Sequence, residues 1–304
     1  MAVIVALARY GTGSRSEASG DAWVDPARLS FGSPSPWMDP RWIDTLEDLA
    51  AQTDPFIVAD GQALQAFGER LLELPFIERL GKLGADRRRG LFVELTLRRP
   101  EACIPVGEGF LLVSRDGVVL PGRWEDPPRS GLGFLPVIGP VRDAGLFALA
   151  RPGDWLVDPS HLDAIEVAIS LRKHLDESAR RRLGRCLIDA SRGPQASVEE
   201  PGIRLLLEDK RLCLFGRSPT TEEPGELPVA AKWNALACAL ALVDATPPRD
   251  WDLVDCRWDR PDLRLARSPR LAGVAAISGR GRKRPDRRGE SETGASRTVG
   301  PRVR

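Results

Sequence analysis

His161 and His174 are the two histidines of the chain, and histidine is the side chain best suited to proton transfer near neutral pH. Both fall in one predicted helix, where a separation of thirteen residues places them about 20 Å apart, too far to share a catalytic site. The chain contains no GxSxG, HExxH, GxGxxG or P-loop pattern, and its many carboxylates form no pair that the spacing singles out. The sequence therefore predicts no enzyme and no bound cofactor.

Five cysteines are the other side chains with inherent reactivity, and they lie at Cys103, Cys186, Cys213, Cys238 and Cys256. Their odd number, wide spacing and lack of a CxxC pair indicate neither a zinc site nor a disulfide framework. Four of the five lie in apolar runs, so we expect most of them to be buried thiols. Their redox state and the compartment remain open at this stage.

Basic clusters could bind nucleic acid, but each has a simpler structural interpretation. We expect Arg87–Arg89 to be a solvated hairpin tip, and Arg180–Arg182 to lie in the last turn of a helix, where cations stabilise the helix dipole. The segment Gly279–Arg304 holds nine basic and three acidic residues, with almost no large apolar side chains. Such a composition predicts a disordered basic tail over residues 267–304. A nucleic-acid adaptor is the less favoured alternative, because the tail has no aromatic residue on which a base could stack.

The first hundred residues predict a small α+β domain over 27–100, after an N-terminal segment or linker at 1–26. Ala2–Ala8 is apolar, but it is too short to cross a membrane, which takes about 20 residues. Apolar spacing and start signals then predict the order strand, helix, helix, strand, strand. These elements are expected at Ala27–Phe31, 39–51, 60–74, Ile77–Leu83 and Leu91–Arg99.

The stretch Leu91–Gly122 connects that domain to the rest of the chain. Its apolar residues alternate with polar ones up to Pro100, as in a strand with one buried face. Two further apolar runs follow, separated by Gly107-Glu108-Gly109, and Asp116-Gly117 is a strong hairpin signal. The stretch therefore predicts a strand that ends one domain and a β-meander that begins the next.

A second domain over residues 101–266 is predicted to be a mixed, β-rich structure with packed helices. A helix is expected from Asp158 to Gly184, with Ser160 and Asp163 close to a capping box. A strand, a hairpin, a second helix and a final pair of strands should follow. Their predicted bounds are Cys186–Ala190, Ile203–Leu207, Arg211–Phe215, Pro228–Val243, Trp251–Trp258 and Leu263–Ala266.

Taken together, residues 27–266 resemble the FtsQ/DivIB family of bacterial cell-division proteins. The first resemblance is the strand ending in Arg98-Arg99-Pro100, followed by the meander and Asp116-Gly117, where the family passes from a POTRA domain into a β domain. The second is a hairpin ending in Gly216, then a helix that carries a lysine, then a strand with Asp-x-Arg at Asp255 and Arg257. The resemblance implies a POTRA-like βααββ domain followed by the family's β domain.

The same resemblance implies a non-enzymatic divisome scaffold that links division subunits during septal cell-wall synthesis. Its partners would be other divisome membrane proteins, bound by addition of a β-strand to a sheet edge. It also implies a place at the cytoplasmic membrane facing the periplasm, although the chain contains no complete transmembrane helix. The predicted partner-binding residues are Trp251, Leu253, Asp255, Arg257, Trp258, Leu263 and Leu265.

Two other functions remain open from the sequence. One is a POTRA-like periplasmic adaptor in another envelope pathway, and the other is a cytoplasmic enzyme whose site no motif reveals. The aromatic and apolar residues of the last strands have an alternative interpretation as well. Trp251, Leu253 and Trp258 could simply be core residues, in which case the partner surface would lie elsewhere.

Overall fold

A computed structural model of the chain describes residues 4–5, 23–30, 37–57, 59–86, 90–130, 133–139, 147–197, 199–221, 224–245, 247 and 249–266. These residues belong to one compact unit, Met1–Pro269. Helices and a large mixed sheet make it an α+β structure, which confirms the predicted class. No helix in these ranges is long and apolar enough to cross a lipid bilayer. Arg87–Arg89 and the predicted tail at 267–304 lie outside the described residues.

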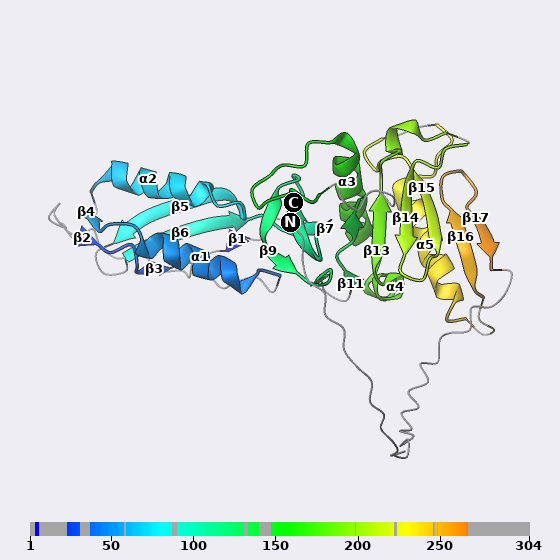
Figure 1. Cartoon of the computed structure of the whole chain (residues 1–304), viewed down its shortest axis with the longest axis horizontal. Coiled ribbons are helices and arrows are strands. Elements are labelled where there is room, and N and C mark those ends of the chain that lie inside the picture. The colour runs from blue at the N-terminus through cyan, green and yellow to red at the C-terminus, as the bar shows by residue number, and fades with distance from the viewer. Residues whose placement is uncertain are drawn as a thin grey trace, which may run out of the picture. The chain divides into compact units, whose positions relative to one another are not determined.

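The N-terminal part is built on a sheet whose central strand is β6 (Gly90–Leu97). Strand β5 (Ile77–Asp86) pairs antiparallel along β6, while β1 (Ile4–Val5) and β3 (Leu29–Ser30) pair with opposite ends of the same strand. Helices α1 (Pro40–Ala51) and α2 (Gly61–Leu72) lie alongside β5 and β6 (Figure 1). The observed order therefore includes the predicted strand, helix, helix, strand, strand.

Both helices begin where the sequence indicates. The Asp39 carboxylate accepts a hydrogen bond from the Arg41 N–H, and the Asp60 carboxylate accepts from the Gln62 and Ala63 N–H groups. The apolar side chains of α1, α2 and β6 meet in one core, as the alternation in β6 predicts. The core includes Trp42, Leu46, Phe67, Leu71, Leu91, Val93 and Leu95.

One prediction for this part is wrong. The sequence predicts a linker up to residue 26, but Trp23–Val24 forms strand β2, which pairs with the unpredicted β4 (Phe56–Ile57). A strand of two residues contains no repeat, so its hydrophobic pattern cannot distinguish it from a loop. Tertiary pairing alone defines these two strands.

The larger sheet has nine strands in the order β17-β16-β15-β14-β13-β12-β7-β8-β9. The predicted meander is confirmed, and Gly117 has the positive φ that its turn requires. The strands are β7 (Pro100–Val106), β8 (Gly109–Ser114), β9 (Val119–Trp124), β12 (Val137–Ile138), β13 (Cys186–Asp189), β14 (Ile203–Leu207), β15 (Leu212–Gly216), β16 (Trp251–Asp255) and β17 (Asp262–Leu265). A short hairpin of β10 (Arg129–Ser130) and β11 (Gly133–Phe134) lies outside this sheet, and a 3₁₀ turn spans Gly193–Gln195.

Helices α3 (Pro159–His174), α4 (Glu177–Leu183) and α5 (Val229–Leu242) contribute to the core on one face of this sheet. The sequence predicts a single helix up to Gly184, but the chain forms two, because Asp176 caps a new helix by accepting from the Ala179 N–H. The predicted capping box at Ser160 is also wrong, since Asp158 is the N-cap and accepts from the Ser160 N–H. Gly184 ends α4 with the expected positive φ.

The meander supplies side chains to two cores, one on each face. Ala102, Ile104 and Val113 join the core that includes α3. Their neighbours Cys103 and Leu112 join the core that includes α1 and α2. Because successive side chains of a strand point to opposite faces, the same three strands belong to both hydrophobic cores.

Gly122, inside β9, lies where the meander meets the N-cap of α1. Its φ is +108°, and a Cβ atom there would lie 2.6 Å from Oδ2 of the helix cap Asp39. We expect Gly122→Ala to lower the free energy of unfolding by about 2 kcal/mol, through backbone strain and displacement of the cap. Chemical denaturation measures this loss.

Gly225 provides a matched control for this substitution. Its φ is +89°, but a Cβ atom there would have no neighbour within 4 Å. Gly225→Ala should therefore report backbone strain alone, about 1 kcal/mol. Equal losses in the two variants would show that the contact with the helix cap contributes nothing.

Candidate functional site

The strongest candidate site lies at the β17 edge of the nine-stranded sheet. Strand β17 pairs antiparallel with β16, and it is the terminal strand of the sheet order. The Ala266 N–H donates to the Asp250 carbonyl at 3.1 Å, so the N–H of the preceding residue, Leu265, points away from β16. An edge of this kind offers backbone donors and acceptors to a further strand.

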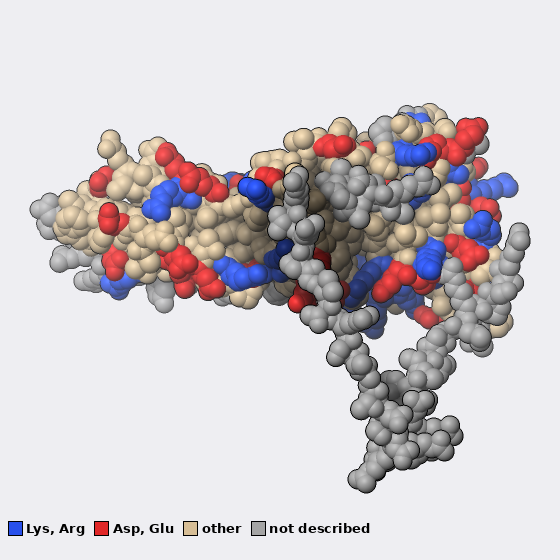
Figure 2. Space-filling view, viewed as in Figure 1, with Lys and Arg blue, Asp and Glu red and all other residues tan. Residues whose placement is uncertain are grey.

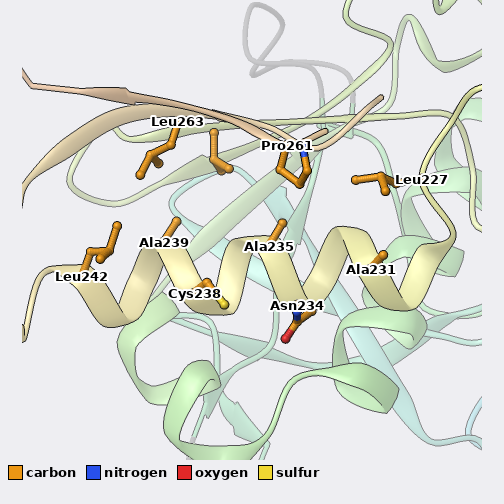
Figure 3. Close-up of a pocket in the computed structure, with 10 residues that line it drawn as sticks. Leu227, Ala231, Asn234, Ala235, Cys238, Ala239, Leu242, Pro261 and Leu263 are labelled. Carbon is orange, nitrogen blue, oxygen red and sulfur yellow. The ribbon is translucent and has the colours of Figure 1, made fainter. Parts of the chain in front are cut away.

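An apolar groove of about 460 Å³ lies between this edge and helix α5. Ala231, Ala235 and Ala239 recur at every fourth residue of α5, on the side of the helix that faces β16 and β17 (Figure 3). Leu263 and Pro261 form the opposite wall. Because alanine side chains end at Cβ, the helix leaves space that larger residues would fill.

The side chain of Trp251 is not available at this site. It is fully buried under α5, and its Nε1–H donates to the Ala239 carbonyl at 2.7 Å. The guanidinium group of Arg211 lies over its ring, 4.6 Å from the centroid. Trp251 thus fixes the distance between β16 and α5, which sets the width of the groove.

Asp255 and Arg257 form an ion pair that closes the end of β16. The Arg257 guanidinium donates to both carboxylate oxygens of Asp255, at 2.8 Å in the shortest contact, and also to the Ser197 carbonyl at 3.0 Å. The ion pair and burial have opposing effects, and the hydrogen bonds to Asp255 dominate, raising the pKa of Arg257. The pair therefore joins the end of β16 to Ser197, next to the edge strand β17.

A second buried ion pair lies beside the first turn of α5. The Lys232 Nζ is 3.0 Å from Oε2 of Glu226, and the exposed fractions of the two side chains are 2% and 10%. The Glu226 Oε1 accepts from the Arg217 N–H, and Nζ lies 4.8 Å from the centre of the Phe215 ring. These contacts hold the start of α5 against the end of β15.

The seven residues predicted to bind a partner therefore lie in different places, and only some of them are at the groove or the edge. Leu263 lines the groove, Leu265 is 50% exposed on the edge strand, and Leu253 is half-buried in β16. Trp258 has left the strand, which ends at Asp255, and it forms an isolated β-bridge with Glu226. Sequence reasoning missed the alanine face of α5 and the Lys232–Glu226 pair. The spacing of the three alanines was a signal that could have indicated the groove.

Signs of catalysis or metal binding are weak in the part of the chain that the structure describes. No group of three or more His, Cys, Asp or Glu side chains there could hold a metal ion. His161 packs against Phe147, with ring centroids 4.9 Å apart, and burial lowers its pKa. Acidic and basic side chains are interspersed over much of the surface that is not drawn in grey in Figure 2.

The candidate site thus consists of an edge strand, an apolar groove beneath it, and two ion pairs that hold the strand and the groove in place. Searches of the chain against protein-family models and against curated proteins find no match.

Proposed function

We propose that this protein is a non-enzymatic scaffold of the FtsQ/DivIB type. In this role it links other divisome membrane proteins during septal cell-wall synthesis, at the cytoplasmic membrane and facing the periplasm. The N-terminal part would be the POTRA-like domain of the family, and the nine-stranded part its β domain. The partner would add a strand to β17 and bury an apolar side chain in the groove below.

One observation carries this proposal, namely that the edge strand and the groove are adjacent. Strand addition needs unpaired backbone groups for affinity and a pocket for alternate side chains to give specificity. The outward N–H of Leu265 meets the first need, and the wall formed by Leu263, Pro261 and the alanines meets the second. The sequence resemblance over residues 27–266 adds the divisome as the setting.

Depletion of the protein in the bacterium that encodes it tests this role. We expect cells that continue to grow and replicate DNA but fail to divide, so that filaments without septa accumulate. A POTRA-like adaptor in another envelope pathway would instead change the content of the outer membrane or of exported proteins, at normal cell length. Cell length and envelope protein content, measured together, separate the two functions.

Filling the groove tests whether it takes part. In the variant Ala235→Leu, the leucine side chain should fill the groove. The protein should stay folded, because the leucine adds apolar contacts inside an existing cavity. We expect at least a tenfold loss of division subunits recovered with the protein after cross-linking, which corresponds to about 1.4 kcal/mol.

Ala241→Leu is the matched control on the same helix, because Ala241 is exposed and does not line the groove. It should leave recovery unchanged. If both variants recover the same amount of division subunits as the original protein, the groove is not part of the partner-binding surface.

A further inference from the structure

A polar cavity of about 220 Å³ lies where the chain passes from β6 to β7. Its walls include this connection, the turn between β8 and β9, and the last turn of α3. A cavity of this size has room for a small polyatomic ion, because one water molecule takes about 30 Å³ in the liquid. The basic residues that line it are Arg98, Arg99, Arg115 and Arg172.

Two of these arginines already have a carboxylate partner. The Arg172 guanidinium donates to the Glu101 carboxylate at 2.5 Å, and Glu101 is only 4% exposed. The Arg98 Nε donates to the Asp116 carboxylate at 2.9 Å. These two ion pairs fix opposite walls of the cavity and leave the other arginines to be accounted for.

Arg99 lies beside these pairs without a partner of its own. Its Nε is buried and has no hydrogen-bond acceptor, and the same holds for the Nε atoms of Arg172 and of Arg180 in α4. Within the part of the chain that the structure describes, neither Arg99 nor Arg180 forms a hydrogen bond or an ion pair.

The surroundings of Arg99 disfavour its positive charge. Burial, together with the charges of Arg172 and Arg180, lowers the pKa of Arg99, and the attraction of Glu101 offsets only part of this effect. A guanidinium group that is partly dehydrated among like charges would be stabilised by an anion. The cavity beside Arg99 provides the space for one.

The charges around the cavity leave two positive charges uncompensated. The lining residues and Arg180 supply five cations against three carboxylates, which belong to Glu78, Glu101 and Asp116. A phosphate group held by one ester bond carries about 1.5 to 2 negative charges at pH 7 and offers three acceptor oxygens. The forked N–H groups of arginine match such oxygens in geometry as well as in charge.

We propose that this cavity binds the phosphate group of a ligand, with Arg99 as the residue that donates to the phosphate oxygens. Arg172 stays paired with Glu101 and, together with Arg180, adds positive charge beside the site. A soluble phosphate compound and the headgroup of phosphatidic acid both present this group. The inference does not rest on the proposed divisome role, because it involves no division subunit.

Titration of the full chain with inorganic phosphate, followed by calorimetry, tests the site. The buffer contains about 0.15 M sodium chloride, which screens weak contacts with surface charges. Arg99→Met keeps a long apolar side chain but removes the guanidinium, so we expect its phosphate affinity to fall at least tenfold. Without ligand, Arg99→Met should melt at the same temperature as the original protein or higher, because a cation is removed from among like charges.

Arg260→Met is the matched control. Arg260 is exposed in the turn between β16 and β17, at the end of the sheet order opposite to the meander. Its substitution removes the same charge from the chain but should leave the phosphate affinity within a factor of about two.

Vesicle flotation separates the two sources of the phosphate group. The protein is mixed with vesicles of phosphatidylcholine, with or without phosphatidic acid. Recovery that requires phosphatidic acid, and that falls at least tenfold in Arg99→Met but not in Arg260→Met, assigns the site to a lipid headgroup. Binding of inorganic phosphate without such recovery assigns it to a soluble compound.

Three results would overturn the inference. The first is a dissociation constant for phosphate above about 10 mM together with no recovery on phosphatidic acid. The second is equal binding by Arg99→Met and Arg260→Met. The third is a marked fall in the melting temperature of ligand-free Arg99→Met, which would show that Arg99 stabilises the fold without any anion.

Discussion

Replacing Lys232 with methionine should lower the free energy of unfolding by about 3–5 kcal/mol, as is typical when one partner of a buried ion pair is removed. The Lys232 Nζ lies 3.0 Å from the Glu226 carboxylate, and both side chains are nearly excluded from solvent. Methionine keeps the length and apolar stem of lysine but leaves the Glu226 charge buried without its cation. Denaturant unfolding, followed by the fluorescence of the buried tryptophans, measures the loss.

Two further variants test whether the unpaired Glu226 charge causes this loss of stability. Lys232→Met with Glu226→Gln removes both charges and keeps the Glu226 side-chain oxygen that accepts from the Arg217 N–H, so it should recover much of the lost stability. Lys173→Met, at an exposed lysine of α3, should change stability by less than about 0.5 kcal/mol. If Lys232→Met behaves like Lys173→Met, the ion pair does not hold α5 in place.

If the protein binds division subunits as proposed, replacing Leu265 with proline should abolish that binding while leaving the fold almost unchanged. The Leu265 N–H points away from β16, so proline removes a donor that does not take part in the pairing of β17 with β16. A strand added to β17 would lose that hydrogen bond and meet the proline ring. We expect at least a tenfold loss of subunits recovered by cross-linking, and filamentous cells when this variant is the sole copy of the protein.

Leu265→Ala is the matched control, because it also removes the leucine side chain but keeps the backbone N–H. Its recovery of division subunits should stay within a factor of about three of that of the original protein. The melting temperature of the proline variant should remain within a few degrees, since Leu265 is half exposed at the edge of the sheet. If the proline and alanine variants bind equally well, the partner does not bind by strand addition at β17.

Lys232→Met and Leu265→Pro test different parts of the same site. The Lys232–Glu226 pair holds the start of α5, and Trp251 holds its other end through the Ala239 carbonyl. These contacts position the wall of the groove, whereas the Leu265 N–H belongs to the surface that the partner would touch. A loss of stability without a specific loss of binding is therefore expected for the first variant, and the reverse for the second.

Local sequence signals predicted the elements that have a repeat or a distinctive residue. Helix α1 begins at its predicted cap Asp39, and the meander turns at Asp116-Gly117. Helix α5 and the β14–β15 hairpin also lie where the pattern places them, within a residue or two. In each case the decisive interaction is between neighbours in the chain, such as a cap, a turn or the alternation of buried residues.

Errors arose where a local signal is ambiguous or where distant contacts decide the local structure. The break between α3 and α4 depends on Asp176, whose side chain could equally well lie on the surface of one long helix. Strands β2 and β4 exist only because they pair with each other, and a two-residue segment has no period. The sequence likewise assigned Trp251 and Arg257 to the partner surface, and nothing in their spacing indicates which face of the final strand is buried.

The sequence by itself determined the α+β class and the order of the main elements. The resemblance indicated residues 251–265 as the partner surface, and this stays a prediction. Only the tertiary structure decided that β17 forms the edge and that three alanines of α5 leave a groove beside it. The physical reason is that strand order and the position of a helix over a sheet depend on contacts between segments far apart in the chain. Local propensity carries no information about such contacts.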